Sequence, residues 1–238
     1  MKNQYSHIVA SGCSFTRGYL EHESKNRLNY NPNIPPGGKY GFVSRLAELL
    51  GCTYKNLAIG GIGIRHSIRL LYEYIDNSKK DLSGTLLILG VSFPFRYDFI
   101  NPLDSSKKYC IPQPLHLANH SNFKKEQAKQ FNTDPEDLQK FVEVFYKNIT
   151  STETLLTEFT QLIDIFQHYC KGKGVDLLTI NMMDPDLIVP NAFKFKDGSL
   201  SWKQYIKGYD SNYGVQHPNY DDHTRLGNLL YEYIKPPI

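Results

Sequence analysis

The sequence predicts an α/β fold: a three-layer sandwich with a mostly parallel sheet of about five strands and helices on both faces. Short apolar runs alternate along the chain with stretches of helical periodicity, which is the order that a parallel sheet requires. The segment Thr85 to Leu89 is a nearly continuous apolar run, typical of a strand covered on both faces. The 238 residues suffice for one large domain, and no linker or internal repeat divides them. We therefore predict a single domain over residues 1–238.

The elements follow one another in a regular order. An apolar run at His7–Ala10 stops at Ser11 and Gly12, which indicates a buried strand that ends in a tight turn. Apolar residues at helical spacing indicate a helix within Gly41–Leu50, and Gly51 is expected to end it. The later predicted elements are a strand at Tyr54–Ile59, a turn at Gly60–Gly63, a helix at Ile64–Ile75, the strand at Thr85–Leu89, one broken or two successive helices within 134–171, a strand at Val175–Asn181 and a helix at Asp221–Ile234.

The segment from about Tyr97 to Asp134 departs from this alternation, because it is irregular, aromatic and polar. We interpret it as an insertion over the sheet edge, near the candidate site. Its aromatic side chains suit either a sugar-stacking or lid surface, or a folded cover for the sheet.

Composition excludes several classes of protein. The chain has 27 basic and 24 acidic residues and no dense basic run, so we expect no nucleic-acid partner. No apolar run approaches the roughly 20 residues that span a bilayer, and no signal peptide is recognisable, so we expect no membrane partner. The four cysteines are widely spaced and form no CxxC pair, which favours a reducing, cytoplasmic location.

Ligands of open parallel sheets bind at the carboxyl ends of the strands, so the residues there are the first candidates for a site. Ser14 directly follows Gly12 and Cys13 at the end of the first strand, where a sharp turn raises its hydroxyl above the sheet as a nucleophile. The alternative is that Ser14 only caps the next element. Gly60–Gly63 after the second strand suits an oxyanion-binding loop or a plain tight turn. A dinucleotide loop is excluded, because His66 stands where its last glycine belongs.

Polar residues also follow the third predicted strand and precede the last helix. Ser92 and Arg96 are suited to stabilise developing negative charge or to hold an anionic substrate group, although Arg96 also fits a plain surface position. Tyr97 is a further candidate for contact with substrate. His217 lies in a polar loop, where an exposed imidazole is able to act as a general base near pH 7.

Four blocks, in this order, resemble those of the SGNH hydrolases, also called GDSL-like esterases. The blocks are Gly12–Phe15 for the Gly-Asp-Ser-Leu turn, Asn56–Gly61 for the Asn and oxyanion Gly, Gly90–Ser92 for Gly-x-Asn, and His217–His223 for the block with the catalytic His. The resemblance spans nearly the whole chain, and it implies a flavodoxin-like sandwich and a hydrolase that acts on ester bonds.

The resemblance also implies a role for each matching residue. Ser14 would be the nucleophile and His217 its general base, while the Ser14 N–H, Gly61 and Ser92 would form the oxyanion hole. His223 falls on the helix-opening position of its block and is expected to be structural. The substrate would be a small-molecule or glycan ester, with an acyl or acetyl group, and neither a cofactor nor a metal is expected.

The sequence departs from the family at three positions. Cys13 replaces the usual Asp of the first block, and Ser92 replaces the Asn of the third. Gly214 stands where the acid of the triad is usual, so a backbone carbonyl, Asp210 or Asp184 would have to orient the imidazole.

Two other readings remain open. The absent Asp and Asn favour a catalytically weak or inactive binding module for a saccharide or a protein. His116 and His120 have the i, i+4 spacing of metal ligands, but the Glu of a metalloprotease motif is absent.

Overall fold

The computed structural model describes residues 5–18, 41–79, 81–94, 96–100, 108–111, 124–125, 128–129, 131–183, 186–206, 218 and 220–235. Its central sheet is four-stranded and all-parallel, in the order β2-β1-β3-β6. These strands are β1 (His7–Gly12), β2 (Thr53–Asn56), β3 (Thr85–Val91) and β6 (Asp176–Asn181). A single parallel bridge between Thr179 and Ala192 continues the sheet beyond β6. The predicted α/β class is confirmed, with four described strands where about five were expected.

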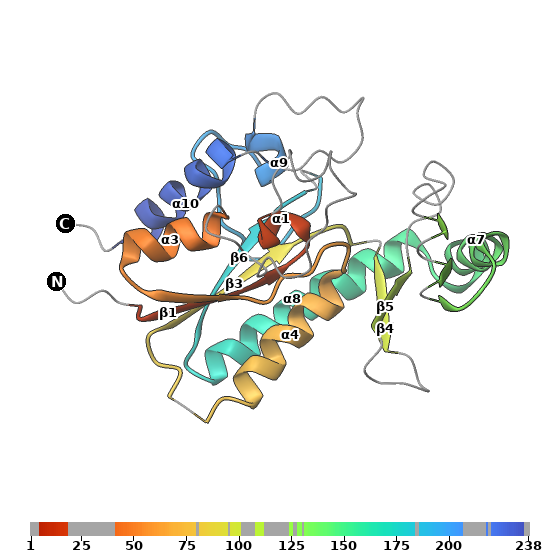
Figure 1. Ribbon diagram of the computed structural model, residues 1–238, viewed down its shortest axis with the longest axis horizontal. Helices are drawn as coiled ribbons and strands as arrows, with labels where there is room; N and C mark the ends of the chain where they lie inside the picture. The colour runs from red at the N-terminus through yellow and green to blue at the C-terminus, as the bar shows by residue number, and fades with distance from the viewer. Residues whose placement is uncertain are drawn as a thin grey trace.

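Helices cover both faces of the sheet (Figure 1). One face is covered by α3 (Phe42–Leu50) and α10 (Tyr220–Ile234), and the other by α4 (Ile64–Asp76) and α8 (Thr152–Gly172). Consecutive strand residues point to opposite faces, so β1 and β3 each contribute to two separate cores. Ile8 and Ala10 pack under α3 and α10, whereas Val9 packs under α4 and α8.

Local hydrogen bonding and backbone conformation explain where α3 and β2 end. Gly51 ends α3 with a φ of 61°, as predicted, because glycine adopts the left-handed conformation at no steric cost. β2 ends at Asn56, three residues earlier than predicted, because the Ala58 N–H turns toward the Asn56 side chain. The chain nevertheless continues beside β1, since the Leu57 N–H donates to the Ala10 carbonyl (2.7 Å).

The segment after β3 is more regular than predicted. β4 (Tyr97–Ile100) and β5 (Lys108–Ile111) pair in antiparallel fashion, because two short strands satisfy each other's backbone groups without joining the main sheet. The expected broken helix is confirmed as α7 (Pro135–Val144), a π-helical turn at Phe145–Ile149, and α8. Figure 1 shows β4, β5 and α7 beyond the ends at which β1 and β3 finish.

Two short helices were not predicted from the sequence. They are α1 (Ser14–Arg17) and α9 (Trp202–Tyr205), each only four residues long and so too short for a periodic pattern. Among the described residues, no helix is both long and apolar enough to cross a membrane.

Candidate functional site

Ser14 is the first residue of α1 and stands at the carboxyl end of β1, in the centre of the sheet. Cys13 before it is extended, with φ −83° and ψ −165°, so the chain passes from strand to helix within one residue. The Ser14 side chain is half-buried. Its backbone N–H has no carbonyl partner within the helix, because the first N–H groups of any helix lack one. A hydroxyl and an N–H of the same residue therefore lie at this strand end.

Cys13 is the other nucleophile type at this turn, but its environment disfavours it. The side chain is only 2% exposed. Burial raises the pKa of the Cys13 thiol above its ordinary value, and the Arg96 charge and nearby backbone N–H groups oppose this rise without cancelling it. A buried, protonated thiol is a poor nucleophile. Ser14 is consequently the better candidate.

Two glycines allow α1 to sit directly on the strand ends. A Cβ atom at Gly12 or at Gly90 would overlap the Oγ1 atom of Thr16, which lies over both glycines. Gly12 also has a φ of 155°, a conformation that other residues rarely adopt. The glycines of the first and third sequence blocks thus have a structural reason. Thr16 was not singled out from the sequence, because its contact depends on β1 and β3 being neighbours.

Asn56 holds the second loop against the Ser14 turn. Its side chain is buried, donates through Nδ2 to the Thr16 carbonyl (2.8 Å) and accepts the Ala58 N–H at Oδ1 (3.0 Å). The Ile59 N–H donates to the Gly12 carbonyl (3.1 Å), which adds a backbone link to the same turn. The loop that contains Gly61 is therefore joined to the Ser14 turn by both side-chain and backbone bonds.

Gly61 lies in this loop with a φ of 82° and is exposed. A Cβ atom there would meet no atom within 4 Å, so the glycine is required by its backbone conformation rather than by crowding. An exposed N–H without a neighbouring side chain is accessible to a substrate oxygen.

Ser92 and Arg96 both contact the carbonyl of Ile62, next to Gly61. The Ser92 side chain is 1% exposed, and its Oγ donates to the Ile62 oxygen at 3.3 Å. Arg96 donates to the same oxygen from Nη1 at 3.5 Å. A hydroxyl has one hydrogen to donate, so Ser92 would have to release Ile62 before it donates to a substrate. Its role as an oxyanion donor stays a prediction.

His217 and the two candidate orienting acids, Asp210 and Asp184, lie outside the described residues, as do His116 and His120. The backbone of Tyr97 is described as the start of β4, where it pairs with Ile111. Within the described ranges, no group of three or more potential metal-ligating side chains comes together.

The helices that precede and follow His217 in the sequence, α9 and α10, both contribute to one aromatic cluster. Trp202 on α9 is fully buried and packs edge-on against Phe15, with ring centroids 5.9 Å apart. His223 on α10 packs against Trp202 at 5.0 Å and lies parallel to Phe42 at 6.2 Å. Because Phe15 follows Ser14 directly, this cluster connects α9 and α10 to the Ser14 turn.

His223 also stabilises the start of α3. Its Nδ1 accepts the Phe42 N–H at 3.3 Å, and α3 has no capping side chain of its own. An acceptor at this place satisfies one of the N–H groups that a helix start leaves without a partner. The buried position and this bond make His223 structural, as expected. Trp202 was missed, although it is the only tryptophan of the sequence.

No family model and no curated protein matches the chain. Among the solved structures similar to it is the psychrotrophic esterase EstA from Pseudoalteromonas sp., with 9% identity, 96% of each chain covered and a TM-score of 0.46. A lipolytic protein of the G-D-S-L family from Veillonella parvula has 11% identity, with 95% of this chain and 96% of that chain covered and a TM-score of 0.39. The acetyl xylan esterase Est2A from Butyrivibrio proteoclasticus has 12% identity, with 97% of this chain and 64% of that chain covered and a TM-score of 0.40. The structural neighbours of this chain are thus GDSL/SGNH esterases and carbohydrate esterases, which cover nearly its full length at low sequence identity.

Proposed function

We propose that the protein is a serine hydrolase that acts on ester bonds, with Ser14 as nucleophile and His217 as general base. The observation that carries this proposal is the Ser14 turn itself. A half-buried serine opens a helix at a central strand end, and the glycine loop of Gly61 is tied to that turn through Asn56. This arrangement combines a nucleophile with two backbone N–H groups that are suited to bind an oxyanion.

The reaction would proceed in two steps. His217 takes the proton of Ser14 Oγ as that oxygen attacks the acyl carbonyl, and the N–H groups of Ser14 and Gly61 stabilise the oxyanion. The C–O bond of the ester then breaks, and His217 returns the proton to the leaving alcohol. Water, deprotonated by His217, attacks the acyl-enzyme, the bond between the acyl carbon and Ser14 Oγ breaks, and His217 returns the proton to Ser14 as the acid leaves. A backbone carbonyl, Asp210 or Asp184 would orient the imidazole.

The substrate would be a small-molecule or glycan ester with an acyl or acetyl group. Tyr97 begins β4, and β4 lies beyond the strand ends in the same part of the molecule as the Ser14 turn (Figure 1). We propose it, with Arg96, as a residue that contacts the substrate. No cofactor or metal enters this mechanism.

A second candidate function is a binding module that has kept the fold without turnover. One observation favours it: the Ser92 hydroxyl, which stands where the family has an oxyanion-binding Asn, already donates to Ile62. Under this alternative, ester or saccharide would bind above the Ser14 turn without formation of an acyl-enzyme.

Fluorophosphonate labelling followed by intact-protein mass spectrometry separates the two candidates. An active serine hydrolase gains one adduct, which is absent from Ser14→Ala and His217→Ala. The matched controls are Ser11→Ala, a buried serine three residues earlier on β1, and His168→Ala, an exposed histidine on α8. Both controls should label as the wild type does. A folded wild-type protein that gains no adduct would refute the hydrolase proposal and leave the binding module.

A further inference from the structure

The Arg96 side chain is half-buried and lies next to the candidate oxyanion loop. Its guanidinium carbon lies 5.3 Å from the centre of the Phe93 ring, a distance typical of a cation–π contact. Its Nη1 donates to the Ile62 carbonyl at 3.5 Å, a long and therefore weak hydrogen bond. These contacts use only a small part of the hydrogen-bonding capacity of the guanidinium, because the group carries five N–H donors.

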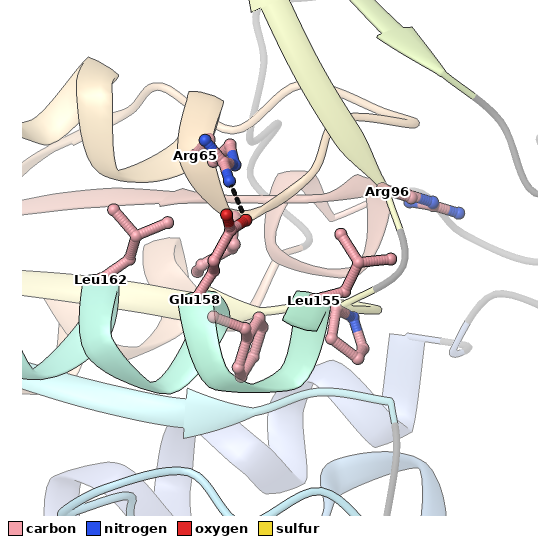
Figure 2. A pocket seen from close by; sticks show the side chains of 8 residues that line it. Arg65, Arg96, Leu155, Glu158 and Leu162 are labelled. Atoms are coloured by element: carbon pink, nitrogen blue, oxygen red, sulfur yellow. Dashed lines mark hydrogen bonds and ion pairs between the residues drawn. The ribbon is translucent and has the colours of Figure 1, made fainter. Parts of the chain in front are cut away.

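The positive charge of Arg96 is not neutralised within the described part of the chain. Figure 2 shows Arg65 and Glu158 pointing toward one another as an ion pair between α4 and α8, while Arg96 points away from both. Among the described residues, no carboxylate forms an ion pair with Arg96. A partly buried cation without a counter-ion is costly, so such a group is most stable when an anion binds to it.

Arg96 lies close to both parts of the candidate site. Ile62, which it contacts, is the neighbour of Gly61 in the oxyanion loop. Cys13, whose pKa the Arg96 charge lowers against the larger effect of burial, is the neighbour of Ser14. The guanidinium is thus within electrostatic range of the reacting atoms as well as of the loop.

We propose that the substrate is an ester that carries a negatively charged group near its scissile carbonyl, and that Arg96 binds this group. The inference rests on the proposed function and assigns its substrate class. A planar guanidinium with free donors matches the two oxygens of a carboxylate in a bidentate manner. The same donors match a phosphate or sulfate group. What these groups share with a carboxylate is that each is a compact anion with two or more oxygen atoms.

Two pairs of esters test the proposal. On the acyl side, 4-nitrophenyl hydrogen adipate is compared with its methyl ester; on the alcohol side, 3-acetoxybenzoate is compared with methyl 3-acetoxybenzoate. Each pair differs only in a carboxylate against its methyl ester. The quantity measured is the ratio of kcat/KM for the anionic and the neutral member, after subtraction of uncatalysed hydrolysis. A third arm measures inhibition by inorganic phosphate, which distinguishes a general oxyanion site from one shaped for carboxylates.

We expect the wild-type ratio to favour the anionic member of at least one pair. Arg96→Gln should lower that ratio by about tenfold or more, the effect of losing a charge-assisted hydrogen bond. Arg96→Lys keeps the charge but not the planar pair of N–H donors, so it should lose part of the preference for the anionic ester. Arg45→Gln is the matched control, because Arg45 is on α3 and binds Glu48 and Asn228. It removes the same charge and should leave the ratio unchanged.

Three outcomes would overturn the proposal. Equal rates for both members of both pairs would show that no anionic group is recognised. Equal loss of rate for anionic and neutral esters in Arg96→Gln would show that Arg96 stabilises the oxyanion or the loop instead. Absence of a fluorophosphonate adduct on Ser14 would refute the proposed function and the substrate class with it. Either of the first two outcomes, obtained with a labelled Ser14, would refute the substrate class alone.

Discussion

The Ser14 turn stands over the central sheet, whereas the outer segment, the described residues from β4 to the π-helical turn, extends to the edge of the molecule at α7 (Figure 1). The two regions are held in different ways. The Ser14 turn is fixed by the overlap of Thr16 with two glycines, by the buried Asn56 and by the packing of Phe15 on Trp202. The outer segment has a small apolar cluster of its own, whose buried members are Ala128, Leu138, Val142 and Phe145. The difference teaches that the candidate catalytic geometry is specified by the main core, whereas the part of the outer segment around α7 has an apolar cluster separate from that core.

The largest loss of stability is expected when a methyl group is added at Gly90, where the neighbouring atoms are closest. Gly90→Ala would press against Thr16 and the Met182 side chain, and should lower the free energy of unfolding by about 3 kcal/mol. Thr16→Ala in the same chain should recover about 1 kcal/mol, since it removes the overlapping Oγ1. Urea unfolding measures both. The control is Gly172→Ala in α8, where a Cβ meets no atom within 4 Å, and which should not destabilise the protein. Equal effects at the two glycines would contradict the tight contact.

The next effect concerns the link between the two loops of the site. Asn56→Ala leaves the Thr16 carbonyl and the Ala58 N–H without their partner, which should cost about 2 kcal/mol of stability. The rate of fluorophosphonate labelling at Ser14 should fall as well, because the Gly61 loop is no longer held. Asn77→Ala is the control, since its exposed side chain follows the end of α4 and donates to the Glu73 carbonyl of that helix, away from the Ser14 turn. A loss of stability without any change in the labelling rate would show that Asn56 stabilises the fold but does not support the candidate site.

A matched pair of valines tests whether the outer segment is stabilised from within. Val142 on α7 and Val43 on α3 are both fully buried helix residues, the first in the outer cluster and the second in the main core. Val43→Ala should lower global stability by about 2 kcal/mol. Val142→Ala should instead speed hydrogen exchange in 131–146 and leave exchange in β1 and β3 unchanged. Faster exchange in β1 after Val142→Ala would show that the two regions unfold together.

The smallest effect is expected at the ion pair between α4 and α8. Arg65 and Glu158 are 28% and 42% exposed in their side chains, so water weakens their attraction. Glu158→Gln should cost less than about 1 kcal/mol, and the cost should shrink in 1 M salt. Glu232→Gln, which breaks the exposed pair with Lys235, is the reference. A cost above about 2 kcal/mol would mean that the pair fixes α8 to the main body.

Prediction from sequence succeeded best where a pattern is local. The buried strand at Thr85–Leu89, the α3 stop at Gly51 and the break between α7 and α8 all follow from apolar periodicity or single-residue conformational preference. The same reasoning placed Ser14 at a strand end, which is confirmed. It missed α1, α9 and the hairpin of β4 and β5, because elements of four residues carry no period of their own.

The sequence by itself determined the α/β class, the order of the main elements and the strand ends that carry polar residues, because each depends on residues close together in the chain. Only the tertiary structure decided that Thr16 lies over Gly90, that Asn56 reaches the Thr16 carbonyl, and that Ser92 and Arg96 share the Ile62 carbonyl. Those contacts join residues that are 30 or more positions apart in the chain. Such pairs meet only because β1, β2 and β3 lie side by side in one sheet, an arrangement that burial of both sheet faces selects and that no local pattern encodes.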